Sequence, residues 1–120
     1  MALDIDWYFK IDDVQGSSAA NGHLSWIDVY SWKSRETGFG QHRKKELSLV
    51  MATGTARARL LVAMQTGHRF IKAQLHGVWN GRPHEQQGWR DLRVISVMPA
   101  GRNRTMQILE EVTFEHDVWR

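Results

Sequence analysis

The chain has 120 residues, a formal net charge of +3 and no cysteine. This length suits one domain over residues 1–120, and 42% hydrophobic residues are enough to fill one core. The lack of cysteine in the sequence excludes disulfides and thiolate metal sites, and no apolar run has the length of a membrane-spanning helix. We therefore expect no insertion into a membrane. The acidic start of the sequence, residues 1–6, does not have the pattern of a signal peptide.

Alternation of apolar and polar side chains begins near the start of the sequence and predicts a strand over residues 3–11. Asp12 and Asp13 follow it. Because neighbouring residues of a strand point to opposite faces, this pair fits a turn better than a shared metal or acid–base site. Small and polar residues at 15–22 predict a loop. Residues 24–33 are rich in aromatic and β-branched side chains and predict a second strand, apolar on both faces in its middle.

The next segment, residues 34–45, shows no alternation. Gly38 and Gly40 flank Phe39, and the segment ends in a run of basic side chains. We interpret this segment as a long excursion rather than a tight hairpin. Alternation returns at residues 46–51 and predicts a third strand.

One helix is predicted, at about residues 55–66. Thr55 is of a residue type that caps helix N-termini, and Gly67 stands where a left-handed residue would end the helix. Apolar side chains between them recur at helical spacing, which predicts one buried face. They are Ala56, Leu60, Ala63 and Met64.

Three further strands are predicted after the helix. They cover residues 71–79, 92–97 and 108–118. All six predicted strands are short and separated by turn or loop residues. The predicted fold class is therefore mainly β, an antiparallel β-barrel or sandwich with one short α-helix.

Turn-forming residues and one charge set the expected limits of these later strands. A turn is expected at residues 80–83, where Pro83 excludes a central strand. Pro99 and Gly101 are expected to stop the fifth strand. Glu110 interrupts the apolar face of the last strand.

The sequence contains no recognisable catalytic or metal-binding pattern. None of its six histidines pairs with another at i+2 or i+4, and neither a nucleophile motif nor a phosphate-binding loop is present. We therefore expect no enzyme activity, no cofactor and no metal.

Six tryptophans are many for a chain of this length. Most fall at alternating positions of predicted strands, which favours packing in the core. Burial of the surplus between subunits is the alternative. They are Trp7, Trp26, Trp32, Trp79, Trp89 and Trp119.

Two segments carry a more specific pattern. Residues 9–16 read Phe-Lys-Ile-Asp-Asp-Val-Gln-Gly and are followed by Ser18, and residues 27–32 read Ile-Asp-Val-Tyr-Ser-Trp after His23. Both segments resemble the Hcp family (also called TssD), the tube protein of bacterial type VI secretion systems. The later elements follow the family's order over most of the chain. The chain is shorter than typical members in the excursion and at its C-terminus, and Ser34 stands where the family's Trp-Ser-Trp segment has its second tryptophan.

This resemblance implies a structural role and no enzyme activity. Proteins similar to Hcp form six-membered rings that stack into a tube inside a contractile sheath, with effector proteins in the lumen. The implied partners are other copies of the chain, the sheath, baseplate and spike proteins, and the effectors. The implied location is the cytoplasm before firing, with export to the extracellular space or a target cell that needs no signal peptide.

The resemblance also suggests residues for two kinds of contact. An arm over residues 35–45 is expected to reach a neighbouring subunit or ring, with an apolar tip and a charged base. Its residues are Arg35, Phe39, His42, Arg43, Lys44 and Lys45. Lys33 takes the position of the serine in the family's Trp-Ser-Trp segment and is a candidate lumen residue. The alternation along the predicted strand 71–79, rather than the resemblance, adds three polar candidates: Lys72, Gln74 and His76.

Two other functions remain open from the sequence. A tail-tube protein of a phage or phage-like contractile particle would have the same fold and ring. A small basic β-barrel that binds nucleic acid would use the arginines and tryptophans. Residues 1–30 contain one lysine and five aspartates, so the positive charge is not uniform, and we expect no nucleic-acid partner.

Overall fold

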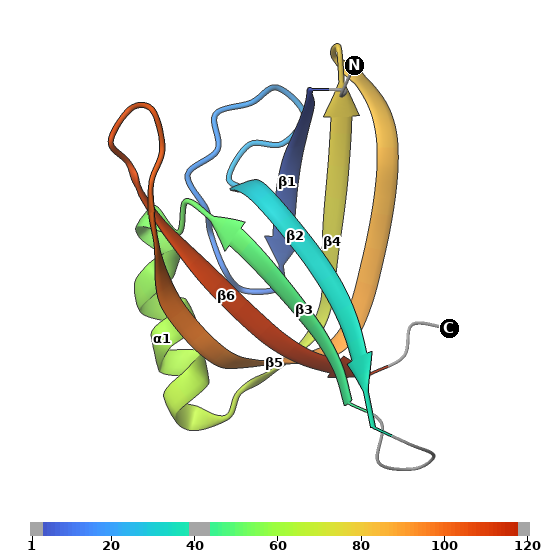
Figure 1. Cartoon of the computed structure of the whole chain (residues 1–120), viewed down its shortest axis with the longest axis vertical. Helices are drawn as coiled ribbons and strands as arrows, with labels where there is room; N and C mark the ends of the chain where they lie inside the picture. The colour runs from blue at the N-terminus through green and yellow to red at the C-terminus, as the bar shows by residue number, and fades with distance from the viewer. Residues whose placement is uncertain (1–3, 39–43, 118–120) are drawn as a thin grey trace.

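The computed structural model describes residues 4–38 and 44–117 and shows an antiparallel barrel with one helix (Figure 1). The strands are β1 (Ile5–Ile11), β2 (Ile27–Thr37), β3 (Lys44–Met51), β4 (Arg69–Trp79), β5 (Arg82–Arg102) and β6 (Ile108–Asp117). They close in the order β1-β2-β3-β6-β5-β4, and every neighbouring pair is antiparallel. The predicted fold class is confirmed, and of its two alternatives the barrel is the one formed.

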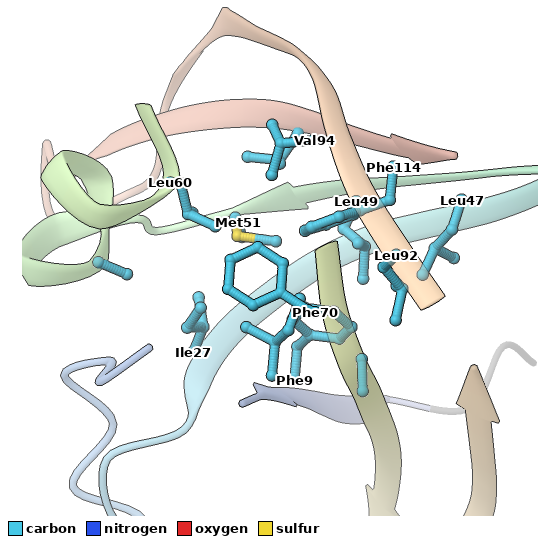
Figure 2. Close-up of a cluster of buried hydrophobic side chains, with 14 of the residues drawn as sticks. Phe9, Ile27, Leu47, Leu49, Met51, Leu60, Phe70, Leu92, Val94 and Phe114 are labelled. Atoms are coloured by element: carbon cyan, nitrogen blue, oxygen red, sulfur yellow. The ribbon is translucent and has the colours of Figure 1, made fainter. Parts of the chain in front are cut away.

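The core follows from the alternation along the strands. Inward side chains such as Phe9, Leu49 and Phe114 are fully buried (Figure 2). Their neighbours in sequence are partly or fully exposed. Burying a side chain of this size contributes about 1.5–3 kcal/mol each. Leu60 of the helix α1 (Arg57–Thr66) points among the core side chains beside Met51, so the helix covers one opening of the barrel.

A β-bulge explains why the second strand is apolar on both faces. The register with β3 shifts between Val29 and Ser31. Ile27 and Val29 are buried before the shift, and Trp32 packs against the core after it. The extra residue therefore moves the inward face from odd to even positions.

The interpretation of residues 34–45 as an irregular excursion is wrong for its described ends. β2 and β3 pair as far as Thr37 and Lys44, so residues 34–37 and 44–45 are strand. Residues 39–43 lie outside the described residues. Residues 34–37 are all exposed, so no buried face imposes the alternation by which a strand is recognised in the sequence.

The fifth strand is 21 residues long rather than six because bulges accommodate both of its prolines. Pro83 pairs with Val78 beside a register shift, and Pro99 lies beside another. Proline lacks a ladder donor and is tolerated at such irregular or edge positions. Asn80 and Gly81 make the predicted turn, with φ of 53° and 76°, which fits a two-residue hairpin turn.

The helix is confirmed at its C-terminus and corrected at its N-terminus. Gly67 has φ of 69° and donates its backbone N–H to the carbonyl of Ala63. Thr55 is not the N-cap. It lies in a short 3₁₀ turn, Gly54–Ala56, and its hydroxyl donates to the carbonyl of Gln15 at 3.3 Å. Within residues 4–38 and 44–117, no helix is long and apolar enough to cross a membrane.

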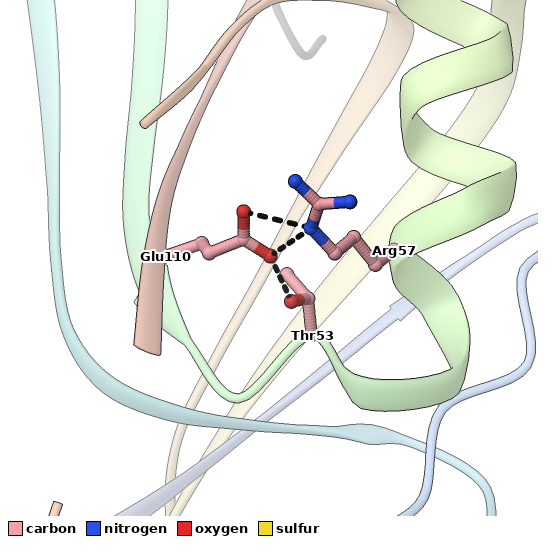
Figure 3. A network of polar contacts seen from close by, with 3 residues as sticks. All are labelled: Thr53, Arg57 and Glu110. Atoms are coloured by element: carbon pink, nitrogen blue, oxygen red, sulfur yellow. Dashed lines mark hydrogen bonds and ion pairs between the residues drawn. The ribbon is translucent and has the colours of Figure 1, made fainter. Parts of the chain in front are cut away.

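Glu110, which interrupts the apolar face of β6, is 4% exposed and anchors the helix. Arg57 Nε donates to both carboxylate oxygens at 3.1 Å, and the Thr53 hydroxyl donates to one of them (Figure 3). The charge therefore has a local partner and hydrogen bonds, as a buried carboxylate requires. This network connects the start of α1 to β6.

Candidate functional site

The outward side chains of β2, β3, β6 and β5 form one polar surface, which we name the outer sheet face. The strand registers arrange it in three rows that cross all four strands. The rows are Ser31-Val50-Glu111-Met98, Lys33-Ser48-Thr113-Ser96 and Arg35-Glu46-Glu115-Arg93. Small hydroxyl side chains and paired charges dominate this surface.

The charged row of the outer sheet face is balanced by its own ion pairs. Arg35 lies 2.9 Å from Glu46, and Arg93 lies 3.4 Å from Glu115. The two glutamates are neighbours across β3 and β6, so each arginine offsets one member of a like-charged pair. In the next row the Ser48 and Thr113 hydroxyls lie 3.0 Å apart and hydrogen-bond to each other. The face therefore offers hydrogen-bonding groups without a strong net charge.

The described ends of the arm, residues 35–37 and 44–45, belong to the paired strands β2 and β3. Arg35, Lys44 and Lys45 lie on these strands, at the bottom of the view in Figure 1. Phe39, His42 and Arg43 were also predicted to belong to the arm and lie outside the described residues. Lys45 Nζ is 3.8 Å from the Glu36 carboxylate, and Arg35 is paired with Glu46, so two of these three basic groups have acidic partners.

The structure does not bring the four predicted lumen residues together. Lys33 is exposed on the outer sheet face. Lys72, Gln74 and His76 lie on the outward side of β4, next to β1 and β5, and no ladder joins them to Lys33. Lys72 and Gln74 are exposed, whereas His76 is half-buried under His23 and Trp26.

Two unlike surfaces lie at different sides of the barrel. The first, the open β2 edge, is the side of residues 31–37 that faces away from β3, where no described strand pairs. The second, the apolar hairpin surface, is formed by Met106 and Ile108 of the β5–β6 hairpin, which are 65% and 56% exposed. Figure 1 shows the β5–β6 hairpin at the upper left and the end of β2 at the lower right.

The β5–β6 hairpin is held in one conformation by Asn103. Its side-chain oxygen accepts hydrogen bonds from the backbone of Thr105 and Gln107, and its side-chain nitrogen donates to the Tyr30 hydroxyl at 3.0 Å. This last bond ties the hairpin to β2. The exposed apolar side chains of the hairpin are therefore presented by an ordered element.

The tryptophans divide between the core and the surface. Trp89 is buried, and Trp7 and Trp32 pack against the core in an edge-to-face chain with ring centroids 5.4 and 6.1 Å apart. Trp79 is 44% exposed, and Trp26 covers part of β4. Trp119 lies outside the described residues.

The part of the chain that the structure describes contains no group of three side chains that could hold a metal ion. The family described as "Type VI secretion system effector, Hcp" matches residues 8–117. The chain belongs to the Hcp family. Hcp is a secreted type VI secretion protein, and the family is one of structural tube proteins rather than of enzymes. No curated protein sequence matches the chain significantly.

Solved structures of Hcp proteins and of a type VI secretion system effector share the fold over nearly the whole chain. Hcp1 from Salmonella typhimurium is 22% identical with a TM-score of 0.79, covering 93% of this chain and 81% of that one. A type VI secretion system effector from Yersinia pestis is 19% identical with a TM-score of 0.71, covering 92% and 82%. The secreted protein Hcp3 from Pseudomonas aeruginosa is 15% identical with a TM-score of 0.62, covering 96% and 86%.

Of the outer sheet face, the sequence singled out two residues: Lys33 as a candidate lumen residue and Arg35 as part of the arm. The members on β3 alternate with buried residues, as Ser48 does between Leu47 and Leu49, so their outward position could be predicted from the sequence. Their gathering into rows depends on the β3–β6 and β5–β6 pairings, which join residues far apart in the sequence. The bulges in β2 and β5 also shift which positions face outward.

Proposed function

We propose that this Hcp protein, acting as one tube domain over residues 1–120, assembles into a six-membered ring and that rings stack into a secretion tube. The observation that carries the proposal is the pair of unlike surfaces on different sides of the barrel. A closed ring needs a heterologous contact, in which one surface of a subunit meets a different surface of the next. An unpaired strand edge and an ordered apolar hairpin are suited to such a contact.

In this ring the outer sheet face lines the channel. Its hydroxyl side chains and paired charges give a hydrated channel wall without a net charge of either sign. Such a wall suits the transport of effectors of differing charge. Lys33 is the exposed lysine of this face and is the proposed lumen contact. Lys72, Gln74 and His76 are left out of the proposed channel wall, because they lie on β4. A nucleic-acid module would need an uncompensated basic groove, whereas the arginines of this face are paired with glutamates.

The ring contact is tested by placing a charge on the apolar hairpin surface. Ile108→Asp is expected to convert rings to monomers, because burying an unpaired carboxylate in an interface costs several kcal/mol. The matched control is Ile71→Asp, since Ile71 is 77% exposed on β4, away from this surface. Native mass spectrometry should show monomers for the first variant and rings for the second, with similar melting temperatures. Intact rings for Ile108→Asp would contradict the proposed contact.

The arm is proposed to contact the adjacent ring. Because Arg35 and Lys45 have acidic partners, the exposed Lys44 and the neighbouring end of the hairpin are left to make the contact. Lys44→Glu is expected to leave single rings intact and to reduce the length of stacked tubes, with Lys72→Glu as the control. Negative-stain images and sedimentation would measure this. Tubes of normal length for Lys44→Glu, at low and molar salt alike, would rule out a charged contact through the arm.

The tube is proposed to work inside a contractile machine. Sheath, baseplate and spike proteins and lumen effectors are the proposed partners. The protein is proposed to reside in the cytoplasm before firing and to leave the cell through its own tube. Co-purification of the tube with its sheath from cells before contraction, and its appearance in the medium afterwards, would test this route.

A further inference from the structure

Two histidines from distant parts of the sequence meet on the outward side of the barrel. His23 belongs to the segment between β1 and β2, residues 12–26, and His76 lies on β4. The Nε2 atom of His23 is 3.2 Å from the Nδ1 atom of His76. At this distance one nitrogen donates a hydrogen and the other accepts it, so the accepting imidazole carries no proton at that atom.

Aromatic rings enclose this pair. The Tyr8 ring stacks on His23 with centroids 4.5 Å apart, and the Trp26 ring lies 4.8 Å from His23 and 4.6 Å from His76. Because Trp26 and His23 both belong to residues 12–26, these contacts join that segment to β1 and β4. Burial, and then the neighbouring His23, lower the pKa of His76 below its ordinary value.

The nearby groups of β1, β4 and β5 do not compensate a second positive charge on the pair. From β1, the Lys10 ammonium lies 5.9 Å from the Trp26 ring and adds positive charge. From β5, the residue opposite His76 is the uncharged Gln86, and Glu85 is its neighbour in sequence, opposite Gly77.

Two carboxylates lie on the other side of the cluster, around Tyr8. Asp6 of β1 and Asp28 of β2 both interact with the Tyr8 hydroxyl, and burial, followed by these two charges, raises the pKa of Tyr8. Burial also raises the pKa of Asp28, whose carboxylate accepts a hydrogen bond from Ser18. These acidic groups therefore act on the tyrosine end of the cluster, and among residues 4–38 and 44–117 no carboxylate is hydrogen-bonded to either imidazole.

We propose that His23 and His76 form a pH-sensitive latch that holds residues 12–26 on the barrel at neutral pH and releases them in acid. When both imidazoles are protonated, each nitrogen of the contact carries a hydrogen, and two positive charges face each other. The contact then has no acceptor and becomes repulsive. Release exposes the Tyr8 and Trp26 rings while the barrel core, which has no part in the contact, stays folded.

The lowered pKa of His76 determines how the stability of the latch changes with pH. At pH values above 6.5, the ordinary pKa of histidine, the latch contributes its full stabilisation to the segment. Its contribution is lost as the pH falls from there through the lowered value in the folded protein. The backbone amides of the segment report its release. Asp12 donates to the carbonyl of Lys72 on β4 at 3.3 Å, and Gly16, Ser18 and Ser25 donate at 2.8–2.9 Å to carbonyls within the segment, whose fold is expected to open once it leaves the barrel.

Hydrogen exchange of these amides tests the latch. Between about pH 7.5 and about pH 5, the protection of these amides, corrected for intrinsic exchange, should fall severalfold. Amides of β3 and β6 should keep their protection. His76→Gln and His23→Gln each remove one imidazole of the contact and should abolish the pH-dependent fall, whereas His84→Gln, on the exposed part of β5, should retain it.

Three results would overturn the proposal. Protection of residues 16–25 could stay constant in acid, it could fall together with that of β3 and β6, or its fall could persist in both glutamine variants. Melting curves of the variants at neutral pH show that each is folded before exchange is measured. The measurement works on rings and on monomers alike, so its outcome does not depend on the proposed assembly.

Discussion

Gly16→Ala is expected to lower the free energy of unfolding by about 3 kcal/mol, at the upper end of the cost of overpacking a well-packed site. A β-carbon at this position would lie 2.4 Å from the carbonyl oxygen of Trp26 and 2.7 Å from Cγ1 of Ile27. The Gly16 amide also donates to the carbonyl of Ser25 at 2.8 Å, so the two backbones cannot separate without losing this bond. Urea unfolding followed by tryptophan fluorescence measures the change.

Gly101→Ala is the matched control for this prediction. Gly101 has φ of 94°, and nothing lies within 4 Å of a β-carbon built on it. The alanine would therefore add only the backbone strain of the left-handed region, which costs about 1–2 kcal/mol. A loss for Gly16→Ala no larger than that for Gly101→Ala would show that residues 12–26 move away easily. Close packing would then no longer explain why a glycine stands at the end of the 9–16 segment.

Arg57→Ala is expected to cost about 3 kcal/mol, because it leaves a buried carboxylate without its cation. Glu110 is 4% exposed and takes both of its charged hydrogen bonds from Arg57 Nε, leaving only the Thr53 hydroxyl after the substitution (Figure 3). Chemical unfolding of the variant and the unmodified protein measures the difference. The double variant Arg57→Met with Glu110→Leu is expected to recover most of the loss, since an apolar pair of similar volume can replace a buried ion pair.

Arg69→Ala supplies the comparison with an exposed ion pair. Arg69 lies 3.0 Å from Asp91, with both side chains largely in solvent, and such pairs contribute at most about 1 kcal/mol. Equal losses for Arg57→Ala and Arg69→Ala would contradict a special cost at Glu110. A double variant as unstable as Arg57→Ala alone would show that shape, and not charge, determines the loss.

The sequence predicted the strands wherever one face is buried and the other is wet. The alternation around Phe9 and Leu49 is of this kind, and both residues are fully buried in the barrel. The strand prediction failed where a strand has no buried face, as at residues 34–37. It also failed where bulges allow a strand to continue past Pro83 and Pro99. These errors concern long-range pairing, which local patterns do not encode.

The same distinction applies to the candidate site. Lys33 was found through its place in a family segment, and its outward position agrees with the proposed role in the lumen. His76 was predicted as a lumen residue from alternation alone. It is instead covered by His23, 53 positions away in the sequence, and local spacing cannot reveal such a contact. In the sequence, Glu110 is recognisable only as a charge on the apolar face of the last strand. The structure shows that it is paired with Arg57, 53 positions away.

The central claim is that this Hcp chain closes into a six-membered ring through unlike surfaces. Native mass spectrometry of the purified protein at micromolar concentration, with negative-stain images of the same sample, tests it most directly. We predict a species of six times 13.9 kDa and a ring with a central hole. A 13.9 kDa monomer without rings would contradict the claim.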